Sequence, residues 1–454
     1  MQNLIKYKQA QAMVRRTVRK AKRQSWRTFC DKIGRSTPVG DVWGMIKSMR
    51  GIRREWQYPV LKLGEDTAES EEEKAEMIAK ALIKIHSSDN LSEEGRVGKA
   101  RTSAAHPGIL ERRGNTDCAM DAPFTLGEMR RALARSGLTS PGGDEICYTM
   151  LKHLGMLASM KLLGIYNKVW EMGKFPSSWK EAVIIPIRKP GKDPSSPMNY
   201  RPIALTSHMG KIMERMVTDR LTFYIESRGL LSPSQSGFRR GRGTMDPVMC
   251  LETEIKKAHV NKESIMAVYF DVEKAYDMVW KEGVMIKLNM MGVAGRVYNW
   301  VKEFLFDRCI QVKIGAAMSQ KYKVENGTPQ GSVISPLLFS IMINDVFSQV
   351  QEDIGRSLFA DDGALWKRGK NIQFIVKRIQ EAVNTVERWS YSWGFKFSVG
   401  KTNSVLFTRR RGLDPQLKIY GQAIERVKEF RFLGVWFDEK LTWNEHISKV
   451  QAKC

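Results

Sequence analysis

Two adjacent aspartates, Asp361 and Asp362, lie inside an otherwise apolar stretch from Ser357 to Trp366. A short apolar run is typical of a buried strand, so the pair stands where the two strands of a hairpin would meet. Adjacent carboxylates repel one another and are costly to hold on a half-buried hairpin unless a cation lies between them. Paired aspartates are also ordinary turn residues, so this stretch alone leaves a plain turn and a magnesium site open.

A third carboxylate, Asp271, ends another apolar run, Ile265 to Phe270. It can meet Asp361 only if the strand that ends at Asp271 pairs beside the hairpin that carries the two aspartates. Two-metal phosphodiester synthesis requires carboxylates that hold both ions ~3.5–4 Å apart. Three acids in this pattern predict a metal-dependent nucleotidyl transferase, and Tyr276, five residues further on, could floor a sugar pocket.

The charge of the chain indicates a polyanionic partner. Lys and Arg number 74 against 49 Asp and Glu, which gives a formal charge of +25 and a pI near 9.8. Nucleic acid is the expected partner, although a solubilising surface would carry the same charge. With 454 residues, 42% of them hydrophobic, we expect a globular protein with several subdomains.

The cysteines and the hydropathy pattern indicate in which cellular compartment the protein is expected. The six cysteines include no C-x-x-C pair, so neither a zinc module nor a disulfide framework is indicated, and a reducing intracellular compartment fits best. No apolar run approaches the ~18 residues of a membrane span, and no secretory segment is present. A soluble protein with no membrane partner is expected.

Several elements can be predicted from spacing. Residues Lys6 to Arg27 carry nine basic residues and no acid, which predicts a basic helix that either packs on the body or clamps phosphates. The stretch from Ser87 to Asp121 lacks periodicity and reads as a linker. Thr125 should cap a helix that turns Leu126, Met129, Leu133 and Leu138 toward a core. We also expect a helix from about Met150 to Met172, strands at Ala182 to Ile187 and from near Arg201, a hairpin of Cys309 to Ile314 with Gln320 to Val324, and an apolar helix after Ser332.

Three segments occur in the order found in reverse transcriptases: Phe-Asp-Val-Glu-Lys-Ala-Tyr-Asp at 270–277, Gly-Thr-Pro-Gln-Gly-Ser at 327–332 and Phe-Ala-Asp-Asp at 359–362. Asn-Tyr-Arg-Pro-Ile at 199–203, Gln-Ser-Gly-Phe-Arg at 235–239, Gly-Phe at 394–395 with Lys-Thr-Asn at 401–403, and Phe-Leu-Gly at 432–434 agree. The chain resembles a non-LTR retrotransposon (LINE-type) reverse transcriptase, its polymerase region without the endonuclease. The turn that introduces this domain commonly reads Pro-Gly-Pro-Asp-Gly, and Gly143 and Glu145 depart from it here.

The resemblance implies a metal site and a general acid. Asp271, Asp361 and Asp362 would bind two Mg²⁺ ions, together with the backbone carbonyl of Val272, and Mn²⁺ is the expected substitute. Lys401 matches a lysine proposed to protonate the leaving pyrophosphate, a task that a positioned lysine can perform. A solvent-exposed lysine remains its alternative.

The resemblance also implies a nucleotide site for deoxynucleoside triphosphates. Arg201 and Lys189 would bind the triphosphate, with Lys192 as a competitor for the lysine role. Tyr276 would be the steric gate against a 2′-hydroxyl, and Gln330 would contact the incoming nucleotide. A surface turn and a core tyrosine are the alternatives for Lys189 and Tyr276.

Contacts to an RNA template and a DNA primer follow from the resemblance alone. Gly331 and Ser332 would lie near the template, although Ser332 could also cap the next helix. The loop from Gln235 to Arg242 would bind the template and primer backbone, and Phe432-Leu433-Gly434 would be the primer grip. The implied nucleic-acid contacts are Arg239, Arg240, Arg242, Gly331, Ser332, Phe432, Leu433 and Gly434.

The predicted function is RNA-directed DNA polymerase of a retrotransposon, in the nucleus or a cytoplasmic ribonucleoprotein. A catalytically silent nucleic-acid-binding fragment and an intron maturase are the alternatives, and target cleavage is not expected from this chain. The fold class implied is α/β, a right-hand polymerase with fingers, a palm with an antiparallel sheet and a partial thumb. The expected segments are a basic helical extension (1–86), a linker (87–122), a lead-in to the fingers (123–169), the reverse transcriptase domain (170–437) and the start of a truncated thumb (438–454).

Overall fold

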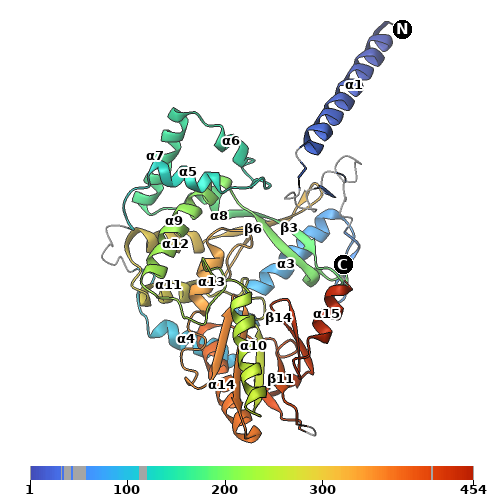
Figure 1. The fold of residues 1–454 in the computed structure, drawn as a ribbon. Coiled ribbons are helices and arrows are strands. Elements are labelled where there is room, and N and C mark those ends of the chain that lie inside the picture. Colours follow the sequence, from blue (N-terminus) through green and yellow to red (C-terminus); the bar gives the residue numbers. More distant parts are fainter. Residues whose placement is uncertain are drawn as a thin grey trace. The chain divides into compact units, whose positions relative to one another are not determined.

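The computed structural model describes residues 2–31, 33–34, 42–43, 46, 58–111, 120–410 and 413–452. The chain divides into two compact units, Met1–Pro59 and Val60–Cys454. In the first unit, helix α1 (Gln2–Cys30) spans the basic segment (Figure 1), which confirms the predicted helix over Lys6 to Arg27. Within the described ranges, no helix combines the length and the apolar character needed to cross a bilayer.

The second unit is a mixed α/β fold around a six-stranded sheet with the order β12-β13-β11-β5-β10-β9. Neighbouring strands are antiparallel except β11 and β13, which pair in parallel. The predicted antiparallel sheet is therefore confirmed for its central strands, and its outer part differs. The strands are β5 (Ser264–Asp271), β9 (Gly355–Phe359), β10 (Asp362–Gly369), β11 (Asn403–Phe407), β12 (Leu417–Ile419) and β13 (Gln422–Arg426).

Strand β5 is buried on both faces because successive side chains alternate between two cores. Met266, Val268 and Phe270 face the larger core, which the sheet shares with several helices. Ile265 and its alternate neighbours face a smaller core beneath α10. The helices concerned are α9 (His208–Ser227), α11 (Lys281–Met290), α12 (Gly295–Leu305), α13 (Ser335–Ile343) and α14 (Ile372–Trp393) for the larger core, and α10 (Met245–Val260) for the smaller one.

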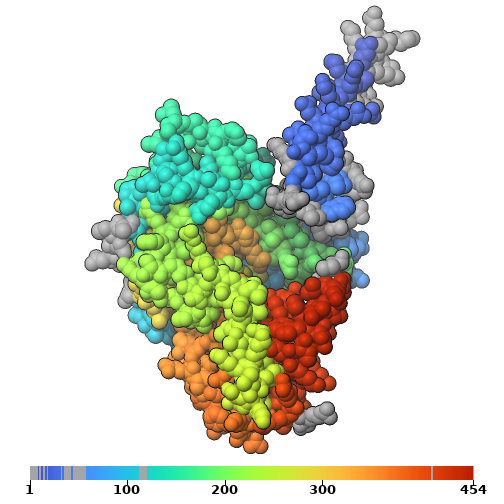
Figure 2. Space-filling model, in the orientation of Figure 1, coloured from blue at the N-terminus to red at the C-terminus, as the bar shows by residue number. Residues whose placement is uncertain are grey.

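The smaller core is closed by a hairpin near the end of the chain. Strands β14 (Glu429–Phe432) and β15 (Val435–Asp438) pair around a two-residue turn, and their side chains Phe432 and Phe437 pack into this core. Figure 2 shows the same arrangement at the surface, where the red C-terminal residues lie against the yellow-green α10. Helix α15 (Asn444–Gln451) follows.

A second sheet contains the two strands predicted at Ala182 to Ile187 and from near Arg201. Its order is β4-β3-β6-β7, with β8 also paired to β6. Strands β3 and β6 are parallel, while β3 and β4 are antiparallel. The predicted hairpin is confirmed with a short extra strand, β7, inside it, and α13 is the predicted apolar helix. The strands are β3 (Glu181–Arg188), β4 (Tyr200–Leu205), β6 (Cys309–Ile314), β7 (Ala317–Met318) and β8 (Tyr322–Lys323).

The helices before β3 follow the capping signals of the sequence only in part. Thr125 begins α5 (Leu126–Ala134) with a capping box to Glu128, as predicted. Leu138 was expected to face the core, but it lies beyond the end of α5 and is 90% exposed. The helix predicted from Met150 to Met172 is interrupted, since Gly155 begins a new helix. The elements are α6 (Tyr148–Lys152), α7 (Met156–Met172), α8 (Ser177–Lys180) and the 3₁₀ turn η2 (Pro197–Asn199).

The predicted boundary of the N-terminal extension at residue 86 differs from the structure. Residues from Val60 onward belong to the second unit, and its first long helix packs on β6 and β7. The amide of Ala316 donates to Glu71 at 3.2 Å, and that of Gln320 donates to Glu76 at 3.1 Å. The elements before residue 105 are β1 (Leu61–Leu63), β2 (Asp66–Ala68), α3 (Glu71–His86), η1 (Ser88–Asn90) and α4 (Glu93–Ala104).

The segment 87–122 was predicted to be a linker, and helix α4 within it contradicts this. Helix α4 packs against α14, where Thr102 donates a hydrogen bond to the carbonyl of Ser392 at 3.0 Å. A Cβ on Gly98 would lie 2.5 Å from the carbonyl oxygen of Tyr391, so glycine allows this close approach. Small residues make the contact, and the apolar periodicity that reveals most helices is therefore missing. Residues 112–119 lie outside the described part of the chain.

One buried cation gives the fold a pH dependence. Lys281 in α11 is 3% exposed, and its ammonium donates to the carbonyl of Val324. Burial, followed by the charge of Arg308, lowers the pKa of Lys281 from 10.5 to about 8. The unfolded chain therefore binds more protons between these two values, and the free energy of unfolding should rise as the pH increases through that window.

We predict that the free energy of unfolding rises less with pH in Lys281→Met than in the parent, and that the difference is at most about 3 kcal/mol. Denaturant unfolding of the parent and the variant at pH 7 and pH 10 gives the free energy of unfolding at each pH. The slope is the change of that free energy with pH. Lys313→Met is the matched control, because Lys313 is exposed on β6 and its replacement should keep the slope of the parent. Identical slopes for the parent and Lys281→Met would contradict the prediction.

Candidate active site

The three acids meet at one end of the central sheet. Strand β10 pairs with β5 so that Asp362 is the partner of Asp271. Asp361 lies in the two-residue turn that joins β9 to β10, since Asp362 also pairs with Phe359. Ala360, the other turn residue, has a positive φ of 55°, which is unfavourable for a residue with a side chain. The predicted juxtaposition of the Asp271 strand and the hairpin is confirmed.

Burial and mutual repulsion raise the pKa values of the paired acids. The pKa of Asp361 is raised, mainly by burial and then by the charge of Asp271, while Lys401 acts in the opposite direction. The pKa of Asp362 is raised to about 6 by burial first, then by the charges of Asp361 and Asp271. Lys401 Nζ lies 3.1 Å from Asp271 Oδ2. The folded protein therefore holds negative charge where it is poorly solvated, and a cation would relieve that cost.

The carboxylates fit a hard cation by their chemistry. Carboxylate and carbonyl oxygens are the ligands that Mg²⁺ prefers, and burial together with neighbouring acids raises the pKa values of Asp361 and Asp362. In the ranges that the structure describes, no three His, Cys, Asp or Glu side chains converge closely enough to form a ready metal site. The case for Mg²⁺ at this site thus rests on the oxygen ligands and their negative charge.

A buried glutamine holds the turn that carries the acids. Gln235 is fully buried, and its Oε1 accepts hydrogen bonds from the amides of Gly237 at 2.8 Å and Ala360 at 3.3 Å. Alongside, the amide of Ser236 donates to the carbonyl of Leu358 at 2.8 Å. A Cβ on Gly237 would lie 2.3 Å from the nitrogen of Ala360. The segment expected to bind nucleic acid therefore also clamps the β9–β10 turn, a role that the sequence did not reveal.

A cavity of about 580 Å³ opens beside the acids. Asp362 does not line this cavity. Lys189 and Lys192 were the two candidate lysines for the triphosphate, and Lys189 lines the cavity whereas Lys192 does not. The predicted residues that do line it come from six separate segments: Lys189, Arg201, Asp271, Val272, Tyr276, Gln330, Gly331, Ser332, Asp361 and Lys401.

The two predicted triphosphate ligands lie on the β3–β4 arm of the second sheet. Arg201 is exposed on β4 opposite Ile187. Lys189 follows β3, and its Nζ donates to the carbonyl of Met198 at 3.0 Å. Burial lowers the pKa of Lys189. Both cations border the cavity, so a phosphate group there would meet one guanidinium and one ammonium.

Tyr276 borders the cavity between the strand end and the next helix. Its ring stacks on Phe339 of α13 with a centroid distance of 4.9 Å. Burial, and then the charge of Asp361, raise the pKa of Tyr276, so its phenol stays neutral. The ring is therefore a rigid wall close to the acids.

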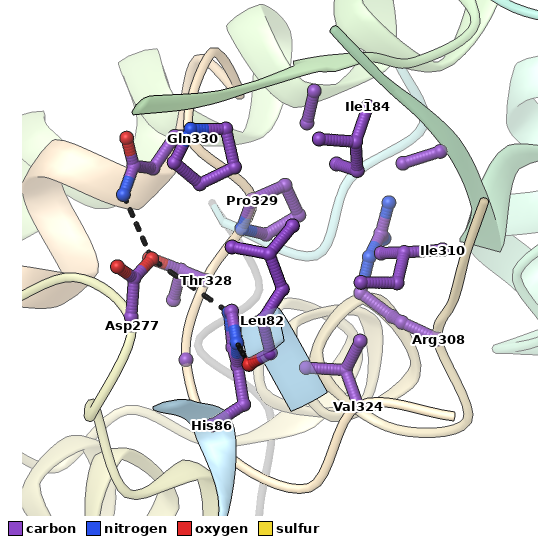
Figure 3. A pocket seen from close by; sticks show the side chains of 14 residues that line it. Leu82, His86, Ile184, Asp277, Arg308, Ile310, Val324, Thr328, Pro329 and Gln330 are labelled. Carbon is purple, nitrogen blue, oxygen red and sulfur yellow. Dashed lines mark hydrogen bonds and ion pairs between the residues drawn. The ribbon is translucent and has the colours of Figure 1, made fainter. Parts of the chain in front are cut away.

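The loop before α13 is fastened to its surroundings. The amide of Ala204 on β4 donates to the carbonyl of Gln330 at 2.9 Å, and the side chain of Gln330 donates to Asp277 (Figure 3). Ser332 is buried and its hydroxyl donates to Glu214 at 2.6 Å. Ser332 does not cap α13, whose N-cap is Ile334 without a side-chain bond, so that alternative was wrong.

The predicted nucleic-acid contacts differ in whether their side chains already bind partners within the protein. The Arg239 guanidinium is an ion-pair partner of Glu226 at 2.6 Å and donates to two carbonyls, so it holds the loop in place. Arg242 donates to the carbonyl of Pro233 at 2.6 Å, and Arg240 is exposed.

In the predicted primer grip, Phe432 is 2% exposed and packs near Tyr269. Phe432 is therefore a core residue. The turn that follows is more exposed, with Leu433 half-buried and Gly434 exposed. The prediction for these residues rested on resemblance, which does not distinguish a buried side chain from an exposed one.

Comparison with known proteins gives a consistent picture. A family model described as "Reverse transcriptase (RNA-dependent DNA polymerase)" matches residues 187–437. The chain is 31% identical over 334 residues to the RNA-directed DNA polymerase from mobile element jockey of Drosophila melanogaster, covering 72% of this chain and 36% of that protein. It is 33% identical over 324 residues to the probable RNA-directed DNA polymerase from transposon BS of the same species, covering 69% of this chain and 36% of that protein.

Among solved structures, apo telomerase from Candida Tropicalis, truncated from its C-terminal domain, matches 65% of this chain and 60% of that chain. The identity is 12% and the TM-score is 0.42, too low to establish a common fold. The chain spans about a third of the length of the curated relatives that it matches. The family match covers more than half of the chain and contains the three acids, Tyr276 and Gln330, so this chain belongs to the reverse transcriptase family.

Proposed function

We propose that this chain is the polymerase region of a mobile-element reverse transcriptase, which extends a DNA primer on an RNA template. The observation that carries the proposal is the strand register that places Asp271 against Asp362, with Asp361 at a cavity that two cations border. In-line attack by a primer 3′-hydroxyl needs this combination of acids for the metals and cations for the triphosphate.

The right-hand description then follows as part of the proposal. The six-stranded sheet would be the palm, since its edge carries the acids. The helices and the strands β3 and β4 from about Pro123 to Lys262 would be the fingers, and α15 would begin a thumb. A linker over 87–122 is no longer proposed, because α4 packs on the palm.

Asp271, Asp361, Asp362 and the carbonyl of Val272 would hold two Mg²⁺ ions, with Mn²⁺ as a substitute. When bound, these ions lower the pKa of the attacking hydroxyl and stabilise the leaving pyrophosphate. The protein itself would fix the turn that carries Asp361 through the Gln235 clamp. Lys401, 3.1 Å from Asp271, is close enough to the acids to protonate the leaving group.

The nucleotide would lie between Arg201 and Lys189 on one side and Tyr276 on the other. Arg201 would bind the triphosphate through its planar fork, and Lys189 would act as a point charge. The Tyr276 ring, fixed by its stacking on Phe339, would exclude a 2′-hydroxyl. Gln330 would contact the base or sugar.

The net charge of +25 supports binding of an RNA template and a DNA primer. Arg240 and the backbone around Gly331 and Gly434 remain the proposed contacts from the predicted set, whereas Arg239 and Ser332 would act by holding their loops. Such a protein would work inside the cell, in the nucleus or in a cytoplasmic ribonucleoprotein. The free thiols of Cys30, Cys147, Cys250 and Cys309 agree with a reducing compartment.

We predict that the purified protein with magnesium or manganese extends a DNA primer on an RNA template, and that Asp361→Asn abolishes extension. The substitution keeps the shape of the side chain but removes the charge that binds the metal. Asp66→Asn, on the exposed strand β2, is the control and should retain activity. Equal extension by the parent and Asp361→Asn, or none by the parent across salt and metal conditions, would refute the proposed activity.

A second prediction concerns sugar selection. Tyr276→Val should increase ribonucleotide incorporation relative to deoxynucleotide incorporation by about tenfold or more, because the smaller side chain leaves room for the 2′-hydroxyl. Tyr276→Phe keeps the ring and should keep the parent ratio. Competition assays with matched ribo- and deoxynucleotides measure it, and an unchanged ratio in Tyr276→Val would remove this residue from the gate role.

A third prediction tests the clamp on the acids. Gly237→Ala would place a methyl group against the backbone of Ala360 and displace the β9–β10 turn, so extension should fall about a hundredfold. Gly243→Ala is the matched control, because nothing lies within 4 Å of a Cβ at that position. Single-turnover extension rates give the comparison. Similar rates for the two variants would show that the clamp does not position the acids.

A further inference from the structure

Asp277, which is buried, and Gln330, which is half-buried, form a hydrogen-bonded pair at the edge of the nucleotide cavity. The side-chain amide nitrogen of Gln330 donates to Asp277 Oδ1 at 2.7 Å, and Asp277 is 9% exposed. Both residues line the cavity that contains Asp271, Asp361 and Arg201. The family resemblance assigned Gln330 to the nucleotide, but it gave Asp277 no task.

The chemistry of the pair fixes the direction of the Gln330 amide. An ionised carboxylate can only accept hydrogen bonds, so the NH₂ group of Gln330 must face Asp277. The carbonyl oxygen of the amide must then point the other way, as Figure 3 shows. Without Asp277, the amide could rotate and exchange its donor and acceptor ends at little cost.

Helix α3 supports the same pair from the other side. His86 Nε2 lies 3.6 Å from Asp277 Oδ1, and its Nδ1 is held 2.7 Å from the carbonyl oxygen of Leu82. The main-chain carbonyl of His86 accepts two hydrogen bonds from Asn326, one from the backbone at 3.1 Å and one from the side chain at 3.0 Å. The end of α3 therefore fixes the start of the loop that carries Gln330, and the His86 ring lies beside Asp277.

The backbone of this loop is also tied to the turn that carries Asp277. The amide of Thr328 donates to the carbonyl of Tyr276 at 3.0 Å, and that of Gly327 donates to the carbonyl of Val279 at 2.8 Å. Main-chain hydrogen bonds thus join the segment of the proposed steric gate to the Gln330 loop. Within it, the Asp277 contact is the one that sets the polarity of the Gln330 side chain.

We propose that Asp277 is a positioning residue that presents the carbonyl oxygen of Gln330 to a hydrogen-bond donor of the incoming nucleotide. The proposal rests on the polymerase function proposed above. Asp277 acts through Gln330 and does not itself touch the substrate. The ligand that it serves is a deoxynucleoside triphosphate, whose sugar hydroxyl and base amino groups can donate to that oxygen.

Exchange of donor and acceptor across the pair tests the proposal. In Asp277→Asn the amide of Gln330 can rotate, and in Gln330→Glu two carboxylates face each other. The double variant Asp277→Asn with Gln330→Glu restores one hydrogen bond, now donated by residue 277, and leaves an acceptor oxygen on residue 330. Each single change should raise the KM for deoxynucleotide roughly tenfold to a hundredfold, with a smaller effect on kcat, and the double variant should recover most of the loss.

Two further measurements separate the possible outcomes. Equilibrium binding of dTTP to the protein with an RNA template and a dideoxy-terminated primer reports on the nucleotide site without turnover, so it remains informative even if the parent does not extend primers. Unfolding midpoints of all four proteins report on a merely structural role. Recovery of affinity in the double variant, without a parallel change in midpoint, supports the proposal. The proposal would be overturned if both single variants bound dTTP with the affinity of the parent. It would also be overturned if the double variant bound dTTP as weakly as the single variant with the lower affinity.

Discussion

The pairing of β5 with β10 is the interaction on which the candidate active site depends. Side chains on a strand alternate between faces, so a slip of one residue would turn every side chain of β10 over. Such a slip would separate Asp362 from Asp271 and expose the apolar residues that now fill two cores. The same register thus maintains the hydrophobic core and the cluster of acids. Selection for a stable sheet and selection for a metal-binding edge act on one geometric constraint.

This geometry concentrates unfavourable contacts at one end of the sheet. Asp271 and Asp362 are paired residues on neighbouring strands with Asp361 in the adjoining turn. A non-glycine residue takes a positive φ in that turn, and burial raises the pKa values of Asp361 and Asp362. Strained and charged arrangements persist where surrounding structure fixes them. Here Gln235 holds the turn through two main-chain amides, and Lys401 lies against Asp271. The site is thus preorganised by neutral hydrogen bonds and by one flexible cation.

The sequence predicted those features that have a strong local pattern. The runs before Asp271 and around Asp361 are continuous and apolar, as expected of strands buried on both faces, and their adjacency could be inferred from the shared need of three acids. The Thr125 capping box was equally readable. Helix α4 was missed because it packs through small residues such as Gly98, which leave no apolar stripe. The resemblance placed Arg239 and Ser332 at the nucleic acid, but their side chains bind internal partners, which only three-dimensional contacts reveal.

The contact between His86 and Asp277 has a consequence for how such proteins can exchange parts. His86 lies outside the range 187–437 that the family model matches, yet it touches the acid that orients Gln330. Recombination between two elements with a breakpoint between these residues would join a Gln330 loop to a foreign α3. The recombinant could keep all three catalytic aspartates and still bind nucleotides poorly. Residues 86, 277 and 330 should therefore be inherited as a unit when polymerase regions diverge or are exchanged.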